Sequence, residues 1–153
     1  MVAAAASAGA ILLTAGTQAA YAVTRNADGT VTVEVDSITD AAGLQAKLRA
    51  AGVNAVVDYL PAGKACQQPW FTPLGRPIGN VSTRGGVDRQ NGSFRFTISA
   101  DIPADATLVV TTQTGAGNDR ALGIAWAQGE VPPCQVVDAP PGSGPLGGPP
   151  TTG

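Results

Sequence analysis

The stretch YAVTRNADGTVTVEV, residues 21–35, decides the fold because it holds two short extended runs around a tight turn. Asn26, Asp28 and Gly29 tolerate positive φ angles, and the Asp-Gly pair is a strong hairpin signal. Residues 30–35 then alternate, with valines on one face and threonine or glutamate on the other. This pattern predicts an antiparallel hairpin whose second strand is half-buried.

An amphipathic helix is predicted directly after this hairpin, within SITDAAGLQAKLRAAG at residues 37–52. Thr39 or Asp40 can cap its first amides, and Gly52 suits the position after its last turn. Its narrow apolar stripe consists of Ala41, Leu44, Leu48 and Ala51. The polar positions expected to face water are Gln45, Lys47 and Arg49.

The strand pattern of the remaining chain predicts the α+β fold class. The run VNAVVDYL at 53–60 is typical of a buried strand, so strand, helix and strand are interpreted as one right-handed βαβ unit. Residues 61–92 are rich in turn formers and are expected to hold one short strand near Cys66. Three later runs, at 93–99, 107–113 and 121–129, are interpreted as a C-terminal β-meander. We therefore expect a small, mainly antiparallel sheet with one packed helix.

The first 22 residues carry no charged side chain, and the first charge is Arg25. A helix of about 20 residues would span a hydrocarbon core of about 30 Å. Three interpretations stay open: a transmembrane anchor with Tyr21 at the interface, a signal peptide cleaved after Ala22, or a buried core helix. Because exported segments normally follow basic residues and residues 1–24 contain none, we expect a basic stretch encoded upstream of Met1.

Two cysteines, Cys66 and Cys134, favour export. They lie far apart in a small chain and without metal-binding spacing, which is typical of one disulfide formed outside the cytoplasm. Closing a loop of about 68 residues stabilises a domain by roughly 4 kcal/mol in the chain-entropy model. The alternative is a pair of buried free thiols in a cytoplasmic protein.

These features divide the chain into three parts. Residues 1–22 are the predicted membrane anchor or signal segment, and residues 23–138 the predicted extracytoplasmic α+β domain. Residues 139–153 contain so much proline and glycine that they cannot bury a core, so we expect a disordered tail.

A candidate ligand surface is predicted between the two cysteines. Trp70 and Phe71 would form either an aromatic platform or, as we prefer, a hydrophobic plug against the disulfide. The neighbouring stretch 64–95 is locally basic and suits anionic envelope polymers or lipid headgroups. Its candidate contact residues are Arg76, Arg84, Arg89 and Arg95.

Composition argues against most enzyme classes. The chain has no histidine, so neither a Ser-His-Asp nor a Cys-His site can form, and the commonest metal ligand is missing. We predict no metal and no cofactor. The net charge of −2 and the lack of interleaved aromatic and basic residues argue against nucleic acid. A carboxylate pair would be required for a histidine-free hydrolase. Its candidates are Glu34, Asp36, Asp58, Asp101 and Asp105.

The hairpin and helix motifs together resemble a group of membrane-anchored extracytoplasmic proteins of actinobacteria. In that group an apolar segment runs into a T-[RK]-N-x-D-G-T-V-T-V hairpin, similar to residues 24–33 here, and then into a helix similar to LRAAGV at 48–53. A later part resembles residues 127–134. The resemblance implies a membrane anchor and an exported domain, and it brings no catalytic residues.

The sequence thus predicts a membrane-anchored extracytoplasmic domain that is not an enzyme. It would be a surface binding or structural module, held in the membrane by its N-terminal helix and touching an envelope polymer or a surface protein. The alternatives are a histidine-free hydrolase of envelope glycan and the sensor ectodomain of a signalling protein encoded further upstream.

Overall fold

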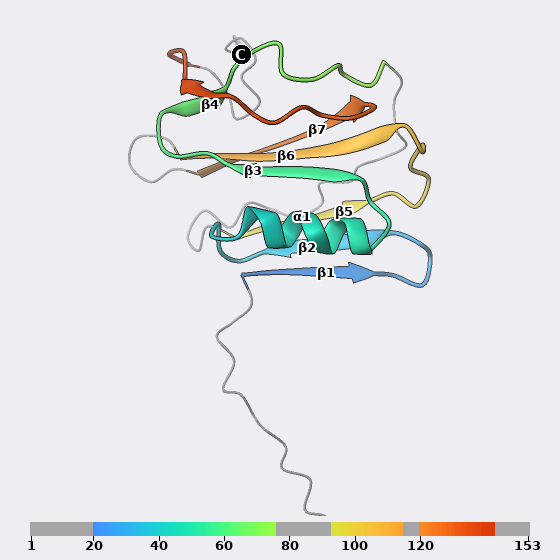
Figure 1. The fold of residues 1–153 in the computed structure, drawn as a ribbon. Helices are drawn as coiled ribbons and strands as arrows, with labels where there is room; N and C mark the ends of the chain where they lie inside the picture. The colour runs from blue at the N-terminus through green and yellow to red at the C-terminus, as the bar shows by residue number, and fades with distance from the viewer. Residues whose placement is uncertain (1–19, 76–92, 115–119, 143–153) are drawn as a thin grey trace, which may run out of the picture.

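The computed structural model describes residues 20–75, 93–114 and 120–142 (Figure 1). These residues form a mixed α+β fold with two three-stranded sheets, ordered β1-β2-β5 and β3-β6-β7, and a two-stranded sheet of β4 and β8. In chain order the elements are β1 (Tyr21–Arg25), β2 (Val31–Val35), α1 (Ala41–Ala50), β3 (Ala55–Tyr59), β4 (Lys64–Cys66), β5 (Phe94–Ile98), β6 (Ala106–Thr114), β7 (Arg120–Gln128) and β8 (Val136–Asp138).

The predicted N-terminal hairpin is confirmed. Strands β1 and β2 pair antiparallel around a turn in which Gly29 has a φ of 86°, a left-handed angle that glycine adopts without steric penalty. The Asp28 carboxylate accepts hydrogen bonds from the backbone N–H and the hydroxyl of Thr30. These local bonds hold the turn and lower the pKa of Asp28. Every second residue of β2 is buried, as the alternation predicted.

Strand β5 lies beside β2 rather than in a meander with β6, so the predicted C-terminal meander is wrong. The pairing aligns Val33 with Phe96 and Val35 with Phe94, which joins two apolar faces of the same period. In contrast, β6 is buried along its first seven residues. A strand that is buried on one face and a strand that is buried on both faces suit different sheets, and residues 99–105 carry the chain between them.

The predicted βαβ unit is also wrong, because β2 and β3 belong to different sheets. Both edges of β2 are already occupied by β1 and β5, which leaves no ladder for β3. Strand β3 instead pairs parallel with β6, and β6 pairs antiparallel with β7 along nine residues of each strand.

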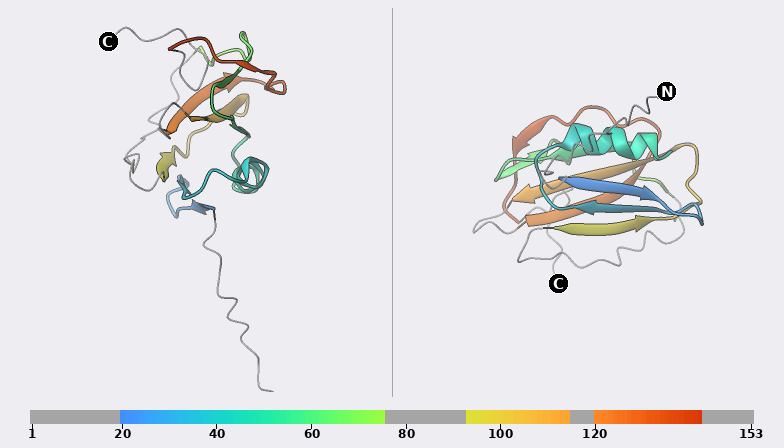
Figure 2. Two further views of the ribbon diagram at one scale, coloured as in Figure 1. Left: turned by 90° about the vertical axis from the view of Figure 1, so that its left-hand side faces the viewer. Right: turned by 90° about the horizontal axis from the view of Figure 1, so that it is seen from below.

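The main core lies between the two three-stranded sheets, and α1 closes one side of it (Figure 2). The helix begins after Asp40, whose carboxylate accepts a hydrogen bond of 2.8 Å from the Gly43 N–H, and ends before Gly52, which has a φ of 87°. Its Leu44 and Leu48 are fully buried in the core. The helix contacts β1 of one sheet and β3 of the other, so it seals the gap between two sheet edges.

Two polar side chains of α1 hydrogen-bond the free edge of β3: Gln45, which was expected to face water and is half-buried, and Arg49, which is exposed as expected. Gln45 Oε1 accepts a bond of 3.0 Å from the Val57 N–H, and Arg49 Nε donates one of 3.2 Å to the Ala55 carbonyl. Gln45 and Arg49 are four residues apart on the helix, a rise of about 6 Å, and Ala55 and Val57 are two residues apart on the strand, a rise of about 6.6 Å. The two bonding side chains are therefore spaced as their backbone partners are. The helix thus provides two of the hydrogen bonds that a further strand would supply, which helps to protect this edge from pairing with another chain.

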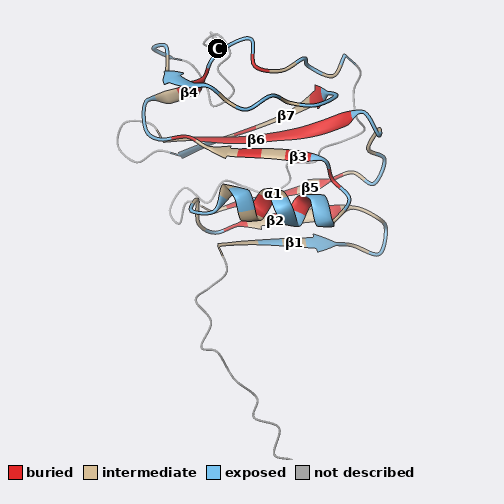
Figure 3. Ribbon diagram, viewed as in Figure 1, coloured by how far each residue is buried: buried red, intermediate tan, exposed pale blue. Residues whose placement is uncertain are grey.

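A second, smaller cluster covers the outer face of the β3-β6-β7 sheet, the face turned away from the main core. Its buried members are Leu60, Cys66, Trp70, Val109 and Ala127. Because Val109 belongs to β6 while its neighbours Leu108 and Val110 lie in the main core, β6 is buried from both sides (Figure 3). This outer layer consists of residues 60–75, which include β4, and residues 129–138, which include β8. We name it the disulfide layer.

The predicted anchor lies mostly outside the described residues. Tyr21 and Ala22, its last two residues, form the start of β1 and pair with Val35 and Glu34. In the part of the chain that the structure describes, no helix is long and apolar enough to cross a bilayer. The predicted tail also lies largely outside these residues, although the Ala139 N–H bonds the Gly63 carbonyl.

Replacing Gln45 by alanine tests the seal between α1 and β3. Gln45→Ala leaves the buried Val57 N–H without its acceptor, so we expect the free energy of unfolding to fall by about 1–3 kcal/mol. Urea unfolding followed by circular dichroism measures it. Lys47→Ala, on the exposed face of the same helix, is the matched control and should change little; equal losses in both variants would contradict this role of Gln45.

Candidate functional site

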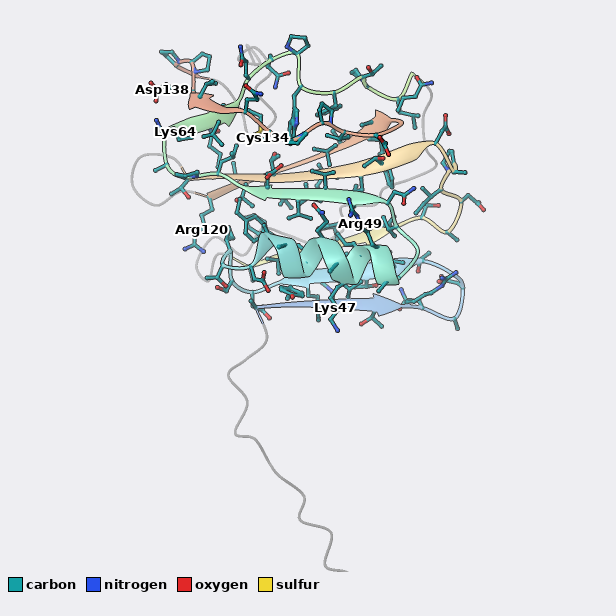
Figure 4. All side chains as sticks on the ribbon, viewed as in Figure 1. Lys47, Arg49, Lys64, Arg120, Cys134 and Asp138 are labelled. Atoms are coloured by element: carbon teal, nitrogen blue, oxygen red, sulfur yellow. A yellow bond between two sulfur atoms is a disulfide. The ribbon has the colours of Figure 1, made fainter. Side chains whose placement is uncertain are left out.

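The disulfide between Cys66 and Cys134 is confirmed, with a Cα–Cα distance of 5.2 Å. It joins β4 to the segment that leads into β8, and the antiparallel pairing of these two strands continues from it, with Cys66 opposite Val136. Lys64 Nζ and Asp138 Oδ1 form an ion pair of 2.5 Å at the far end of this small sheet. Figure 4 shows Lys64, Asp138 and Cys134 grouped around β4.

Trp70 belongs to the core of the disulfide layer. Its side chain is 5% exposed, and its indole Nε1 donates a hydrogen bond of 2.9 Å to the Pro132 carbonyl. The ring meets that of Phe71 edge-on, with centroids 5.5 Å apart. A buried ring with a satisfied N–H offers no open face to a ligand, so the arrangement matches the hydrophobic plug rather than the platform.

The predicted basic surface is not assembled within the described residues. Arg76, Arg84 and Arg89 lie outside them. Arg95 lies on β5 of the β1-β2-β5 sheet, opposite Glu34 of the neighbouring strand β2. Its Nε forms an ion pair with Glu34 Oε1 at 3.0 Å. Since β5 and the disulfide layer belong to different layers of the fold, Arg95 and Trp70 do not contribute to one common surface.

Asp58 is placed beside the disulfide by the alternation of β3. Ala55 and Val57 point into the main core, so Asp58 points to the opposite face, where the disulfide layer lies. One of its carboxylate oxygens and the two cysteine sulfurs all lie within 4.8 Å of one another. Sulfurs joined in a disulfide cannot act as thiolate ligands, so this group does not form a metal site while the bond is intact.

Burial raises the pKa of Asp58 above its usual value of 3.8. The folded state therefore holds the proton more tightly than the unfolded chain does. Ionisation of Asp58 as the pH rises through its folded pKa consequently lowers stability, and this effect is absent at pH values below the unfolded pKa. The opposite holds for Asp138, whose pKa is lowered by the hydrogen bond and charge of Lys64.

A polar cleft of about 570 Å³ opens where β3 and β6 begin and β7 ends. This volume lies in the range of small-ligand sites. The charged and amide side chains that line the cleft come from four separate segments and are Arg49, Asn54, Asp105 and Glu130. The cleft thus combines a guanidinium group with two carboxylates, and all four residues are exposed to solvent.

Hydrogen bonds across three segments hold the walls of the cleft. The Gly129 N–H donates to the Asp105 carbonyl at 2.6 Å, and the Thr107 hydroxyl donates to the Gly129 carbonyl at 2.6 Å. On the other wall the Leu108 N–H donates to the Asn54 carbonyl at 2.8 Å. Gly129 has a φ of 73°, an angle that a side chain would strain. The polar groups of the cleft therefore project from a backbone that is held in place by hydrogen bonds between segments.

The carboxylates named for a hydrolase do not gather here. Of the five, Asp105 lines the cleft, Glu34 pairs with Arg95, and Asp58 lies beside the disulfide. The second acid of the cleft is Glu130, which sequence reasoning missed. It lies in a turn-rich segment with no catalytic or binding motif, so only the meeting of β3, β6 and β7 identifies it.

Comparison of the chain with protein-family models, curated proteins and solved structures found no match. The resemblance to the actinobacterial group therefore stays a prediction.

Removing the disulfide should destabilise the domain strongly. The double variant Cys66→Ala and Cys134→Ala opens a loop of 68 residues, so we expect the free energy of unfolding to fall by about 4 kcal/mol. Urea unfolding of the wild type with and without reductant measures the same quantity independently. The double variant is the control, because reductant should not change it further. Unaltered stability after reduction would contradict the prediction.

Proposed function

We propose that this chain is a membrane-anchored extracytoplasmic binding module that recognises a polar polymer of the cell envelope through the cleft at Arg49, Asp105 and Glu130. The observation that carries the binding function is the cleft itself, because it presents charges of both signs on a braced backbone. The module acts by adhesion rather than by catalysis.

The disulfide supports an extracytoplasmic location. A disulfide that closes a long loop persists in an oxidising compartment and is rare in the cytoplasm. It also joins the two segments of the outer layer, so an oxidising compartment favours the folded state.

The start of the folded domain supports an uncleaved anchor. The Ala20 carbonyl accepts hydrogen bonds of 2.9 and 3.0 Å from the N–H groups of Asp36 and Ser37. The Tyr21 hydroxyl lies 3.2 Å from Oδ2 of Asp40, the N-cap of α1. Cleavage after Ala22 would remove all of these contacts and shorten β1 by two residues. We infer that residues 1–22 stay attached to the domain.

The chemistry of the cleft supports a ligand that carries both amino and carboxyl groups. Arg49 suits an anionic oxygen, although its Nε is already bonded to Ala55, and the carboxylates of Asp105 and Glu130 suit an amine. Peptide-bearing envelope glycan has these groups in close succession. A purely anionic polymer would meet two carboxylates, so it fits the cleft less well.

Location is tested by fractionating the native host that carries the chain with a C-terminal tag. We expect the tagged protein in the membrane fraction, with the mass of the full chain and an intact disulfide under non-reducing conditions. Retention follows from the role of Tyr21 and Ala22 in β1. A product that begins at Val23 in the medium, or a reduced protein in the cytosol, would contradict the anchored location.

Binding is tested with the detergent-solubilised full chain and purified, peptide-bearing cell-wall glycan. Glu130→Lys reverses one charge of the cleft, and we expect at least about a tenfold loss of affinity, the equivalent of about 1.4 kcal/mol. Asp36→Lys makes the same charge change on an exposed residue that does not line the cleft and should bind as the wild type does. Equal binding by all three proteins would refute the cleft as the site. Release of soluble fragments from the glycan by the wild type would favour the hydrolase instead.

A further inference from the structure

The carboxylate of Asp58 and the disulfide form a cluster that the binding function does not use. The carboxylate oxygen and the sulfurs of Cys66 and Cys134 come from three segments and lie within 4.8 Å of one another. At this separation a carboxyl group can exchange a proton with a sulfur through one bridging water, or directly after a small movement of its side chain.

The two sulfurs of the cluster differ in their access to solvent. Cys66 is 3% exposed, whereas Cys134 is partly exposed. Because Cys134 is the more exposed of the two residues, we assign its sulfur as the one that an external thiolate attacks, and the leaving sulfur is that of Cys66. A thiolate released into the buried environment of Cys66 is unfavourable, because burial penalises its charged form. Opening of the bond thus calls for a proton donor beside Cys66.

We propose that Asp58 is the acid–base group for thiol–disulfide exchange at Cys66–Cys134, so that this disulfide is a redox site and not only a staple. The inference is independent of the ligand proposed for the cleft, which is lined by other residues.

Opening of the bond takes two exchange steps with a small external thiol as the reductant. First, the external thiolate attacks Cys134 Sγ and forms a mixed disulfide; the Cys66–Cys134 bond breaks, its electron pair goes to Cys66 Sγ, and this sulfur takes the proton of the Asp58 carboxyl. Second, another external thiolate attacks the external sulfur of the mixed disulfide and releases Cys134, which takes a proton from solvent. The external thiols leave as their own disulfide, so the two electrons come from them.

Closing of the bond reverses these steps with an external disulfide as the oxidant. From the mixed disulfide at Cys134, the Asp58 carboxylate accepts the proton of the Cys66 thiol. The Cys66 thiolate then attacks Cys134 Sγ and expels the external thiolate. The raised pKa of Asp58 makes its carboxylate a better base than an ordinary aspartate, which helps this step.

The neighbouring charges leave this role to Asp58. Lys64, the cation on β4 two residues from Cys66, is engaged in its ion pair with Asp138. Val136 lies opposite Cys66 in the β4–β8 pairing, and Asp138 lies opposite Lys64 at the other end. Because its pKa is lowered, the Asp138 carboxylate is also a poorer proton carrier than Asp58. Asp138 therefore serves as the matched control carboxylate.

The test follows both directions of exchange in the full chain with reduced and oxidised glutathione. The reaction is quenched with acid at timed intervals, and intact mass separates the disulfide, the mixed disulfide and the dithiol. In Asp58→Asn we expect the rates of opening and closing to fall together by at least about tenfold, toward the 10²–10⁴ typical of lost acid–base catalysis. The equilibrium constant with glutathione should change much less than either rate. Asp58→Glu should recover part of the rate, and Asp138→Asn should react as the wild type does.

Three results would overturn the proposal. One is unchanged rates in Asp58→Asn. Another is an equal loss of rate in Asp58→Asn and Asp138→Asn, which would indicate general loosening of the disulfide layer. The third is a shift of the equilibrium constant without a slower approach to it. Circular dichroism checks that each variant is folded; if Asp58→Asn is not, Asp58→Thr is measured in its place, because threonine is a good strand former.

Discussion

The covalent bond between Cys66 and Cys134 is the constraint on which the outer half of the molecule depends. The two segments that it joins contain little regular structure, and the small sheet of β4 and β8 has three residues in each strand. Without the bond, the burial of a few side chains would have to offset the loss of conformational entropy when these segments become ordered. With it, they lie as a stable layer over β6 and β7, where Trp70 is buried.

This cover explains the composition of β6. In a strand that is buried on both faces, apolar residues and threonines follow one another without alternating polar residues. TLVVTT at 107–112 has this composition. One face meets the main core and the other meets the disulfide layer. Since β3 and β7 take their positions from β6, the layer also positions the cleft, which opens at the ends of these three strands.

The helix solves a different problem, the exposed edges of two small sheets. Leu44 and Leu48 fill the core between the sheets, while Gln45 and Arg49 bond the backbone of β3. On the opposite edge of the same sheet, residues 72–74 bond the backbone of β7. Each edge of the β3-β6-β7 sheet is therefore partly covered, at Ala55 and Val57 of β3 and at Trp126 and Gln128 of β7, which limits pairing with other chains at these positions. Arg49 has a second role, since the same side chain lines the cleft.

The sequence by itself determined the local features: the hairpin at Asp28 and Gly29, the helix capped by Thr39 or Asp40, strands β1 to β7 near their observed positions, and the disulfide. Each depends on turn chemistry, capping, periodicity or cysteine count, which act over short stretches or allow one pairing. Only the tertiary structure decided which strands share a sheet, because the register of β5 against β2 and of β3 against β6 depends on faces that meet across tens of residues. For the same reason it alone brought Glu130 to Arg49 and Asp58 to the disulfide, since nothing in the local pattern of these residues distinguishes them from solvated charges.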